Sequence, residues 1–383
     1  MKFALTFLAA LLLGATGCAT KAPRPALTGD LILDGKNAIT YGPAKDRVLW
    51  EYRVGLAALR RGDFDEAKRQ FDDAITRIGG IYTTDAGARK ARSFFNTEAK
   101  KTFIGEPYER AMAYYYRGLL YWRDGEPDNA RACFRSAQFQ DAGTEKNDYA
   151  ADYVLLDYLD GFASVKLGSG DGADEMARAV KNARGGSQPP AYFKKANVLV
   201  FIDFGQGPRK FATGEHAQQL RFGEQTSPAR SVNLKLGAQQ FPLVAYDDLQ
   251  WQATTRGGRV MDHILANKAV FKNATEGAAV VAGVTAIGLA NSRQGEAALI
   301  AGGVALVAGI LSATTTPEAD IRAWDNLPRF LTFAALELPP GEHSLAVDFR
   351  DAGGTTLSTR TITFTVPSNS TKDTVLYVSE HKT

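Results

Sequence analysis

Residues 55–75, GLAALRRGDFDEAKRQFDDAI, predict a pair of packed helices and with it the fold of the N-terminal half. Gly62 can turn the chain between the helices, because glycine readily adopts the left-handed conformation at a helix end. Small residues on the facing sides let the two backbones approach closely, and Phe71 can fill the groove that remains. The small residues are Gly55, Ala67 and Ala74. The stretch therefore reads as a helical hairpin.

The same register returns in residues 118–138, GLLYWRDGEPDNARACFRSAQ, and more loosely in 161–180, GFASVKLGSGDGADEMARAV. The matching positions are Gly118, Tyr121, Gly125, Ala130, Phe134 and Ala137 in the second copy, and Gly161, Gly168, Ala173 and Ala177 in the third. This spacing resembles that of a tetratricopeptide (TPR) repeat, whose helix pairs stack into an extended surface. We therefore predict a TPR-like α-helical domain over 47–185 with a concave surface for a protein partner.

The helix around residue 115 is rich in aromatic side chains, which contribute strongly to protein interfaces. Tyr115, Tyr116 and Trp122 are therefore candidates for binding a partner. The alternative is that they belong to the core. Tyr114 and Tyr121 lie seven residues apart on one helix face, as do Tyr115 and Trp122, so at least one pair is expected to be buried.

A β-rich half follows the Pro189-Pro190 pair. The predicted strands are 196–204, two strands within 330–349 around a Pro-Pro-Gly turn, 356–366 and 374–380. On the first strand, the alternate residues Val198, Val200, Ile202 and Phe204 share one face. Short strands broken by turns are typical of a β-sandwich. The fold prediction is an α+β multidomain protein, with a β-sandwich-like domain over 186–383.

An apolar helical hairpin interrupts this half, within an insert of about 258–312. Its helices are 277–290, GAAVVAGVTAIGLA, and 296–311, EAALIAGGVALVAGIL. Small residues form a stripe along each helix, and such stripes allow close helix packing. The stripes consist of Ala278, Ala282 and Ala286, and of Ala297, Ala301, Ala305 and Gly309. Each run is shorter than the roughly 20 residues that span a bilayer. Packing within the protein, self-association and bilayer insertion therefore all stay open.

The segment before the hairpin, 254–272 or TTRGGRVMDHILANKAVFK, is basic. Arg256 and Arg259 flank two glycines and could hold an anionic group of a partner at a helix start. Pairing of these arginines with local carboxylates is the alternative, since no second phosphate-binding element follows.

The N-terminal sequence predicts the cellular location. Residues 1–17 have a positive start, an apolar run and small residues before Cys18, the layout of a secretory signal. The small residues before the cysteine resemble the lipobox of bacterial lipoproteins, with Ala15 where leucine is usual. That resemblance implies lipidation of Cys18 with acyl chains such as palmitate, and several chains anchor stably. Ala19 in place of aspartate then implies the outer membrane, and 18–46 is predicted to be a tether with the folded part in the periplasm.

The chain also resembles an uncharacterised family of bacterial envelope lipoproteins with TPR-like repeats. The residues that carry this resemblance are GEPYERAMAYYYRGLLYWRDGEPDNAR, 105–131, together with 254–272. It covers most of the chain after the signal and implies architecture and location, but no chemistry.

The sequence contains no recognisable catalytic motif. None of its four histidines lies at metal-ligand spacing from another histidine or a cysteine, and it has no nucleophile elbow, phosphate loop or paired cysteines. We therefore predict a non-enzyme without metal or cofactor. A net charge of +3 argues against a nucleic acid partner.

The sequence thus predicts an outer-membrane-anchored periplasmic lipoprotein that acts as a protein-binding scaffold or assembly factor in an envelope complex. Its partners would be envelope proteins, and the membrane through the lipid anchor. The alternative is an oligomerising or membrane-inserting component that acts through the hairpin at 277–311, which would make the protein a homo-oligomer.

Overall fold

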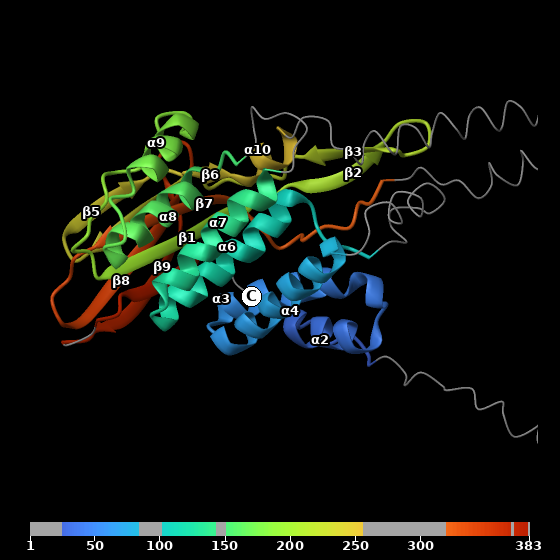
Figure 1. Cartoon of the computed structure of the whole chain (residues 1–383), viewed down its shortest axis with the longest axis horizontal. Coiled ribbons are helices and arrows are strands. Elements are labelled where there is room, and N and C mark those ends of the chain that lie inside the picture. The colour runs from blue at the N-terminus through green and yellow to red at the C-terminus, as the bar shows by residue number, and fades with distance from the viewer. Residues whose placement is uncertain (1–24, 84–101, 143–150, 256–318, 369–370, 382–383) are drawn as a thin grey trace, which may run out of the picture.

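A computed structural model describes residues 25–83, 102–142, 151–255, 319–368 and 371–381. Helices occupy the N-terminal part of this chain and strands the C-terminal part (Figure 1). The N-terminal helices are α2 (Leu31–Tyr41), α3 (Arg47–Arg61), α4 (Phe64–Thr83), α6 (Pro107–Asp124), α7 (Pro127–Asp141), α8 (Val154–Leu167) and α9 (Ala173–Asn182), with a 3₁₀ turn at Ala44–Asp46. A short helix, α10 (Leu249–Thr254), lies among the strands. The structure is mixed α/β, and its helices precede most of its strands along the chain, as predicted.

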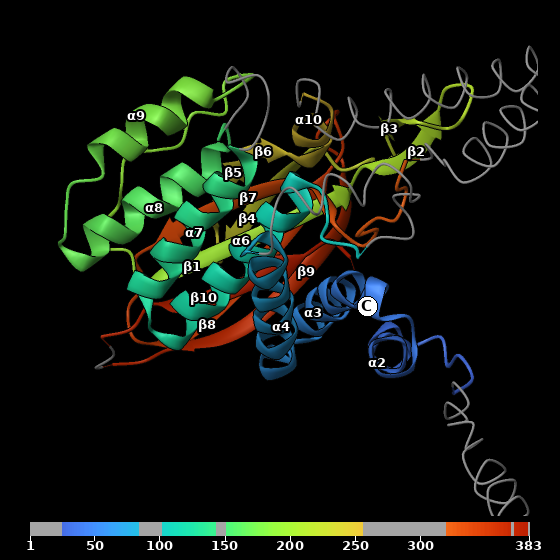
Figure 2. The same ribbon diagram turned by 45° about the vertical axis from the view of Figure 1, so that its right-hand side comes forward.

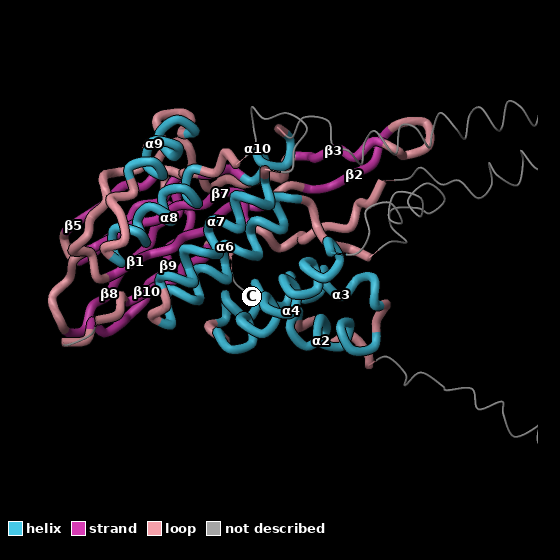
Figure 3. Tube along the Cα trace, viewed as in Figure 1, coloured by secondary structure: helices cyan, strands magenta, loops and turns pink. Residues whose placement is uncertain are grey.

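The strands form two four-stranded sheets and a separate hairpin. They are β1 (Val198–Gln206), β2 (Arg209–Thr213), β3 (Gln219–Gly223), β4 (Ser231–Leu236), β5 (Gln239–Leu243), β6 (Asp247–Asp248), β7 (Pro328–Leu336), β8 (Gly341–Arg350), β9 (Thr356–Val366) and β10 (Thr374–Ser379). The first sheet has the order β10-β1-β7-β6, with β1 and β10 parallel, and the second has the order β5-β4-β8-β9. Strands β2 and β3 pair only with each other. Helices α3, α6 and α8 contact the sheet that contains β1, and α4, α7 and α9 pack on these helices (Figures 2 and 3).

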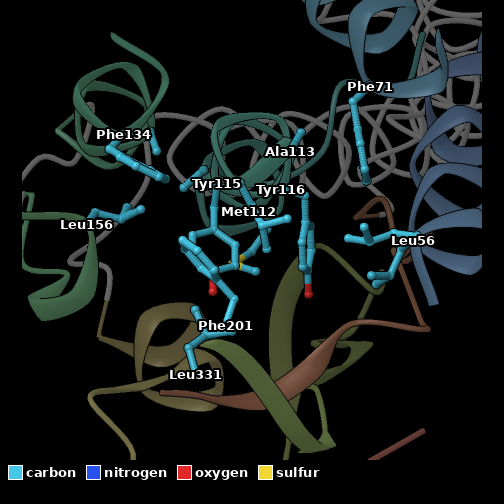
Figure 4. Packing of buried hydrophobic residues seen from close by; sticks show 14 of the residues in the cluster. Leu56, Phe71, Met112, Ala113, Tyr115, Tyr116, Phe134, Leu156, Phe201 and Leu331 are labelled. Atoms are coloured by element: carbon cyan, nitrogen blue, oxygen red, sulfur yellow. The ribbon is translucent and has the colours of Figure 1, made fainter. Parts of the chain in front are cut away.

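Strand β1 is buried on both of its faces. Val198, Val200, Ile202 and Phe204 join an apolar cluster with β4 and β8 of the second sheet, as predicted for one shared face. Leu199 and Phe201 point the other way and belong to the cluster that the helices form. Figure 4 shows Tyr115 of α6 directed at Phe201 from this side. The helices and the first sheet therefore share one apolar cluster, and β1 separates it from the cluster between the two sheets.

Two helical hairpins are built on the same glycine–phenylalanine contact. A Cβ atom on Gly55 would lie 3.0 Å from the Phe71 ring, and one on Gly118 would lie 2.7 Å from the Phe134 ring. The distance at Gly118 is too short for a Cβ atom and the one at Gly55 is tight, so α6–α7 requires glycine at this position and α3–α4 favours it. The helices α3 and α6 both end on a glycine with positive φ, Gly62 and Gly125. The alanines expected to face inward are fully buried; they are Ala67, Ala74, Ala130 and Ala137.

The third hairpin, α8–α9, departs from the predicted register. Ala173 and Ala177 are exposed, whereas Ala179 is buried. Gly161 faces the Tyr192 hydroxyl instead of a phenylalanine on α9. The loop after α8 spans 168–172 and is longer than the two-residue loops of the first two hairpins, so the inward position of α9 shifts from Ala177 to Ala179, and a tyrosine from beyond α9 fills the groove.

Part of the predicted tether is folded. Residues 31–41 form α2. The preceding residue, Asp30, caps this helix: its side chain accepts hydrogen bonds from the backbone N–H groups of Ile32 and Leu33. Its inward face consists of Ile32, Gly35 and Ala38 and packs on α3. Two of these three residues are small, so hydrophobic periodicity did not reveal the helix.

The prediction of two strands within 330–349 is confirmed, but they do not form a hairpin. Strand β7 pairs with β1 and β6, while β8 pairs with β4 and β9 in the other sheet. The Pro-Pro-Gly segment between them carries the chain from one sheet to the other. The strands at 356–366 and 374–379 lie where they were predicted.

Across the described residues, the helices fall short of the length and apolar character needed to cross a membrane. The predicted lipidation site Cys18, the arginines Arg256 and Arg259, and both stripes of the hairpin at 277–311 lie outside the described residues.

Candidate functional site

The predicted aromatic groove does not exist as an open surface. Tyr115, Tyr116 and Trp122 are each at most 1% exposed, so the prediction that they bind a partner is wrong and the core alternative holds. The first sheet covers the side of α6 that carries Tyr115. The centroids of the Tyr115 and Phe201 rings are 6.3 Å apart, and Phe201 belongs to β1 (Figure 4). The Trp122 indole donates a hydrogen bond of 2.9 Å to Asp373, just before β10.

An open cleft lies instead where α3 meets the start of β2. Its volume is about 520 Å³. Its walls come from four parts of the chain that are distant in sequence: residues 46–53, the turn 208–210, Gln225 and the segment 321–325 before β7. The lining side chains are Asp46, Leu49, Trp50, Arg53, Pro208, Arg209, Lys210, Gln225, Ile321, Arg322 and Asp325, with Ala323.

Glu109 at the first turn of α6 holds this region together. One carboxylate oxygen accepts hydrogen bonds from the Glu106 backbone N–H (2.6 Å) and from the Lys210 ammonium (2.5 Å). The other accepts from the Trp324 backbone N–H (2.7 Å). Pro107 and Glu109 are both favourable at a helix start. Pro107 has no N–H group that would need a partner, and the Glu109 side chain accepts a hydrogen bond from a backbone N–H group that the helix leaves free. Glu109 thus joins α6, β2 and the segment before β7.

The Glu109–Lys210 pair is buried, with both side chains at most 1% exposed. Burial raises the pKa of Glu109 and lowers the pKa of Lys210, while their mutual attraction opposes both shifts. Removing one partner of such a pair strongly destabilises the folded protein, because the other charge is then buried without a partner.

Most charges in the cleft are paired. Arg53 donates to Asp325 (2.8 Å) and its guanidinium lies 4.9 Å from the Trp50 ring. Arg322 donates to Asp46 (2.5 Å) and to Asp320. Arg209 is exposed and, among the residues that the structure describes, has no carboxylate partner. Beside these charges, Trp50 is half-buried and Ile321 is 53% exposed.

This arrangement suits binding. Among the described residues, the cleft is lined by one guanidinium without a carboxylate partner, an indole and an aliphatic side chain, which together fit a ligand with a carboxylate and an apolar group. Its two carboxylates, Asp46 and Asp325, are each held by an arginine. Within the described chain, His, Cys, Asp and Glu side chains form no cluster of three or more that could hold a metal ion.

A second group of polar residues lies sealed between the helices and the first sheet. Asp203 on β1 is fully buried, and one of its oxygens accepts hydrogen bonds from Tyr116 (2.9 Å) and Tyr377 (2.6 Å). Arg60 of α3 lies 3.9 Å from the same oxygen. Burial and the Asp203 charge raise the pKa of both tyrosines well above the usual range, so their hydroxyls stay protonated.

Asp247 of β6 caps a distant helix. Its two oxygens accept the backbone N–H groups of Val154 and Leu155 at the start of α8, each at 2.9 Å. Burial raises the pKa of Asp247 to about 7, although these N–H groups favour the ionised form. Glu109, Asp203 and Asp247, here called the junction carboxylates, each link a helix to a strand.

Sequence reasoning missed the cleft residues. Residues 204–210, FGQGPRK, run from the end of β1 to the start of β2 through a link at 207–208, but nothing in the sequence brings Arg209 to the same cleft as Trp50 or Ile321. One local signal was present: Pro107 and Glu109 after Glu106 mark a helix start at which a glutamate accepts backbone N–H groups.

Comparison of the chain with protein-family models, with curated proteins and with solved structures gave no match.

Proposed function

We propose that this protein is a lipoprotein of the bacterial outer membrane, anchored through Cys18 on the periplasmic side, that binds a partner protein as a scaffold or assembly factor of an envelope complex. The observation that carries the binding role is the cleft beside α3. There Arg209, which has no carboxylate partner among the described residues, lines the same cleft as Trp50 and Ile321, while the other charged lining residues are compensated.

The chemistry of the cleft favours an extended segment of a partner. A carboxylate of that segment would pair with Arg209, and a neighbouring apolar side chain would cover Trp50 and Ile321. Arginine and tryptophan are among the residues that contribute most to the binding energy of protein interfaces. The volume of about 520 Å³ falls within the range of small binding pockets.

We also propose that the helices form TPR-like repeats and that the two four-stranded sheets form a β-sandwich. The repeated contact of Gly55 with Phe71 and of Gly118 with Phe134 supports TPR-like repeats in α3–α4 and α6–α7. The apolar cluster between β1 and the strands β4 and β8 supports a β-sandwich. Because β1 covers the inner side of α6, we place partner binding at the cleft and not on the concave side of the repeats.

The binding role is tested by photo-crosslinking in cells. A photoreactive amino acid at Ile321 is expected to give an adduct with one envelope protein, and Arg209→Glu is expected to remove it. Phe139 on α7 is the matched control, because it is 75% exposed and does not line the cleft. Equal adducts at both positions, or none at Ile321, would exclude the cleft as the binding site.

The anchor is tested separately. Labelled palmitate is expected to enter the wild-type protein, and Cys18→Ser is expected to prevent labelling and to release the protein from membranes. Labelling that survives Cys18→Ser would contradict lipidation at this residue.

The second candidate function rests on the two small-residue stripes at 277–311. If that hairpin assembles the protein or inserts into a bilayer, Ala282→Leu with Ala301→Leu should abolish assembly, because leucine prevents close helix approach. If the hairpin instead packs within the protein, the same change should lower stability by about 1–3 kcal/mol through overpacking.

A further inference from the structure

Strand β9 is a long sheet edge that no other strand or helix covers within the described part of the chain. It runs for 11 residues, Thr356–Val366, and pairs with β8 on one side only. No backbone hydrogen bond joins its other side to any residue that the structure describes. A strand edge of this length presents a row of free N–H and C=O groups that can pair with another strand.

The other three edges of the two four-stranded sheets are each blunted. Strand β6 has two residues, and β5 has five and contains Pro242, which has no N–H to donate. Strand β10 has six residues and contacts the helices α3 and α6. Short edges, proline and covering helices are devices by which proteins prevent edge pairing. Their use on three edges makes their absence from β9 informative.

The side chains of β9 also permit pairing. The strand contains no Lys, Asp, Glu or Pro, and its single charge, Arg360, donates to the Ser379 and Glu380 carbonyl oxygens. Threonines alternate along the outer face. They are Thr359, Thr361, Thr363 and Thr365, and all are exposed.

We propose that β9 is a dimerisation edge, at which a second copy of this chain pairs antiparallel through its own β9. The central residue Thr361 lies opposite its own copy in this arrangement, Thr359 lies opposite Thr363, and Leu357 lies opposite Thr365. Cross-strand threonine pairs are favourable, and the two Arg360 side chains are not directly opposed. The two second sheets become one sheet of eight strands.

This pairing is closed. An isologous contact uses the same surface on both copies, so it is satisfied once two chains have met. Since the other edges of the two four-stranded sheets are blunted, these sheets do not extend beyond the dimer. A foreign strand could use the same backbone groups, but the threonines of β9 match one another about the central residue, which favours a second copy. This inference is independent of the cleft and would stand if the cleft bound nothing.

The first test is charge substitution at the two-fold position, in the full chain purified in mild detergent and studied by sedimentation. Thr361→Lys and Thr361→Glu each place like charges opposite each other, so the dimer dissociation constant should rise about tenfold. A mixture of the two variants should return towards the wild-type value, because Lys then faces Glu. Ser344→Lys is the control, since Ser344 is exposed on the neighbouring strand β8, opposite Thr363.

The second test is a disulfide across the two-fold axis. In a Cys133→Ala background, Thr361→Cys should form a covalent dimer, because directly opposed Cα atoms lie within disulfide range. Thr365→Cys should not, because the two copies of that residue would be roughly 27 Å apart along the strands.

A wild-type chain that stays monomeric, or a dimer that Thr361→Lys leaves unchanged, would overturn the proposal. The second of these results would assign dimerisation to another surface, such as the hairpin at 277–311. Monomers whose β9 amide groups become protected from hydrogen exchange only when a different envelope protein is added would assign the edge to a foreign strand, and would also overturn it.

Discussion

On β1, the side chains that face the second sheet are all apolar, whereas those that face the helices run from Leu199 and Phe201 to the buried carboxylate of Asp203. The sheet–sheet side is filled by an apolar cluster without buried charge on β1. The helix–sheet side contains all three junction carboxylates, each bonded to groups from another element. The two faces of one strand therefore differ in how they hold their neighbours.

The difference follows from what each side must join. Two sheets pack through alternating side chains, whose backbone groups are already paired within the sheets. Helices bring free N–H groups at their first turns, and these need partners when they are buried. Glu109 and Asp247 supply such partners from both sides of the junction. We therefore expect changes on the helix side to depend on charge and pH, and changes on the sheet side to depend on volume alone.

The largest effect is expected from Glu109→Ala. It leaves the Lys210 ammonium buried without its partner, and breaking a buried pair in this way costs about 3–5 kcal/mol. Urea unfolding measures the loss. Glu109→Leu combined with Lys210→Met should recover much of it. The control is Lys68→Ala, which breaks a pair with Asp124 nearer the surface and should cost less than about 1 kcal/mol. Equal losses for the two single variants would contradict the expectation that the helix–sheet side depends on the buried Glu109–Lys210 pair.

The next effect is a pH dependence that Asp247 causes. Its folded pKa of about 7 exceeds the ordinary value of 3.8, so between these values the folded state binds more protons than the unfolded state. The stability contribution of this group is therefore fully present below about pH 4 and is lost as the pH rises through 7. The wild type should lose about 2 kcal/mol between pH 5 and 7 relative to Asp247→Asn, which cannot titrate.

The measurement is urea unfolding of both proteins at pH 5, 6, 7 and 8. Asp152 and Arg184 act electrostatically on Asp247 and are present in both proteins, so only the difference between the two curves is informative. A constant difference across this range would show that Asp247 is ionised throughout and that its cap does not depend on pH.

These cases show how far the sequence alone could lead. The alternation of Val198 to Phe204 and the glycine–phenylalanine spacing of the first two hairpins are local patterns, and both led to correct predictions. Helix α2 was missed because Gly35 and Ala38 give almost no hydrophobic signal.

Long-range pairing was beyond the sequence for a different reason. Periodicity reveals which residues are buried, but not what lies opposite them, so Tyr115 could equally have faced a partner protein or β1. The cleft joins Trp50 to Ile321, and the Asp247 cap acts on Val154; these contacts exist only once the sheet is assembled. The same limit explains why β7 and β8 read as a hairpin although they belong to different sheets.

A smaller effect is expected from Tyr377→Phe. It removes one hydrogen bond to the Asp203 carboxylate while Tyr116 keeps the other, and a bond to a charged group is worth about 1.5 kcal/mol or somewhat more. Tyr246→Phe is the matched control, because no hydrogen bond of its hydroxyl is found within the described residues. Thermal unfolding of both variants should show the larger decrease for Tyr377→Phe, and equal decreases would mean that Asp203 does not hold β10 to the helices.

The smallest effect is expected from Ile202→Val on the sheet side of β1. It removes one methylene from a fully buried residue of the apolar cluster, which costs about 1 kcal/mol. Ile78→Val in α4 removes the same group from an equally buried position in the helical layer and should cost a similar amount. Because neither change touches a titratable group, both losses should be the same at pH 5 and pH 8 in urea unfolding. A loss at Ile202 that varied with pH would mean that the sheet–sheet side is coupled to the junction carboxylates, and the contrast between the two faces of β1 would not hold.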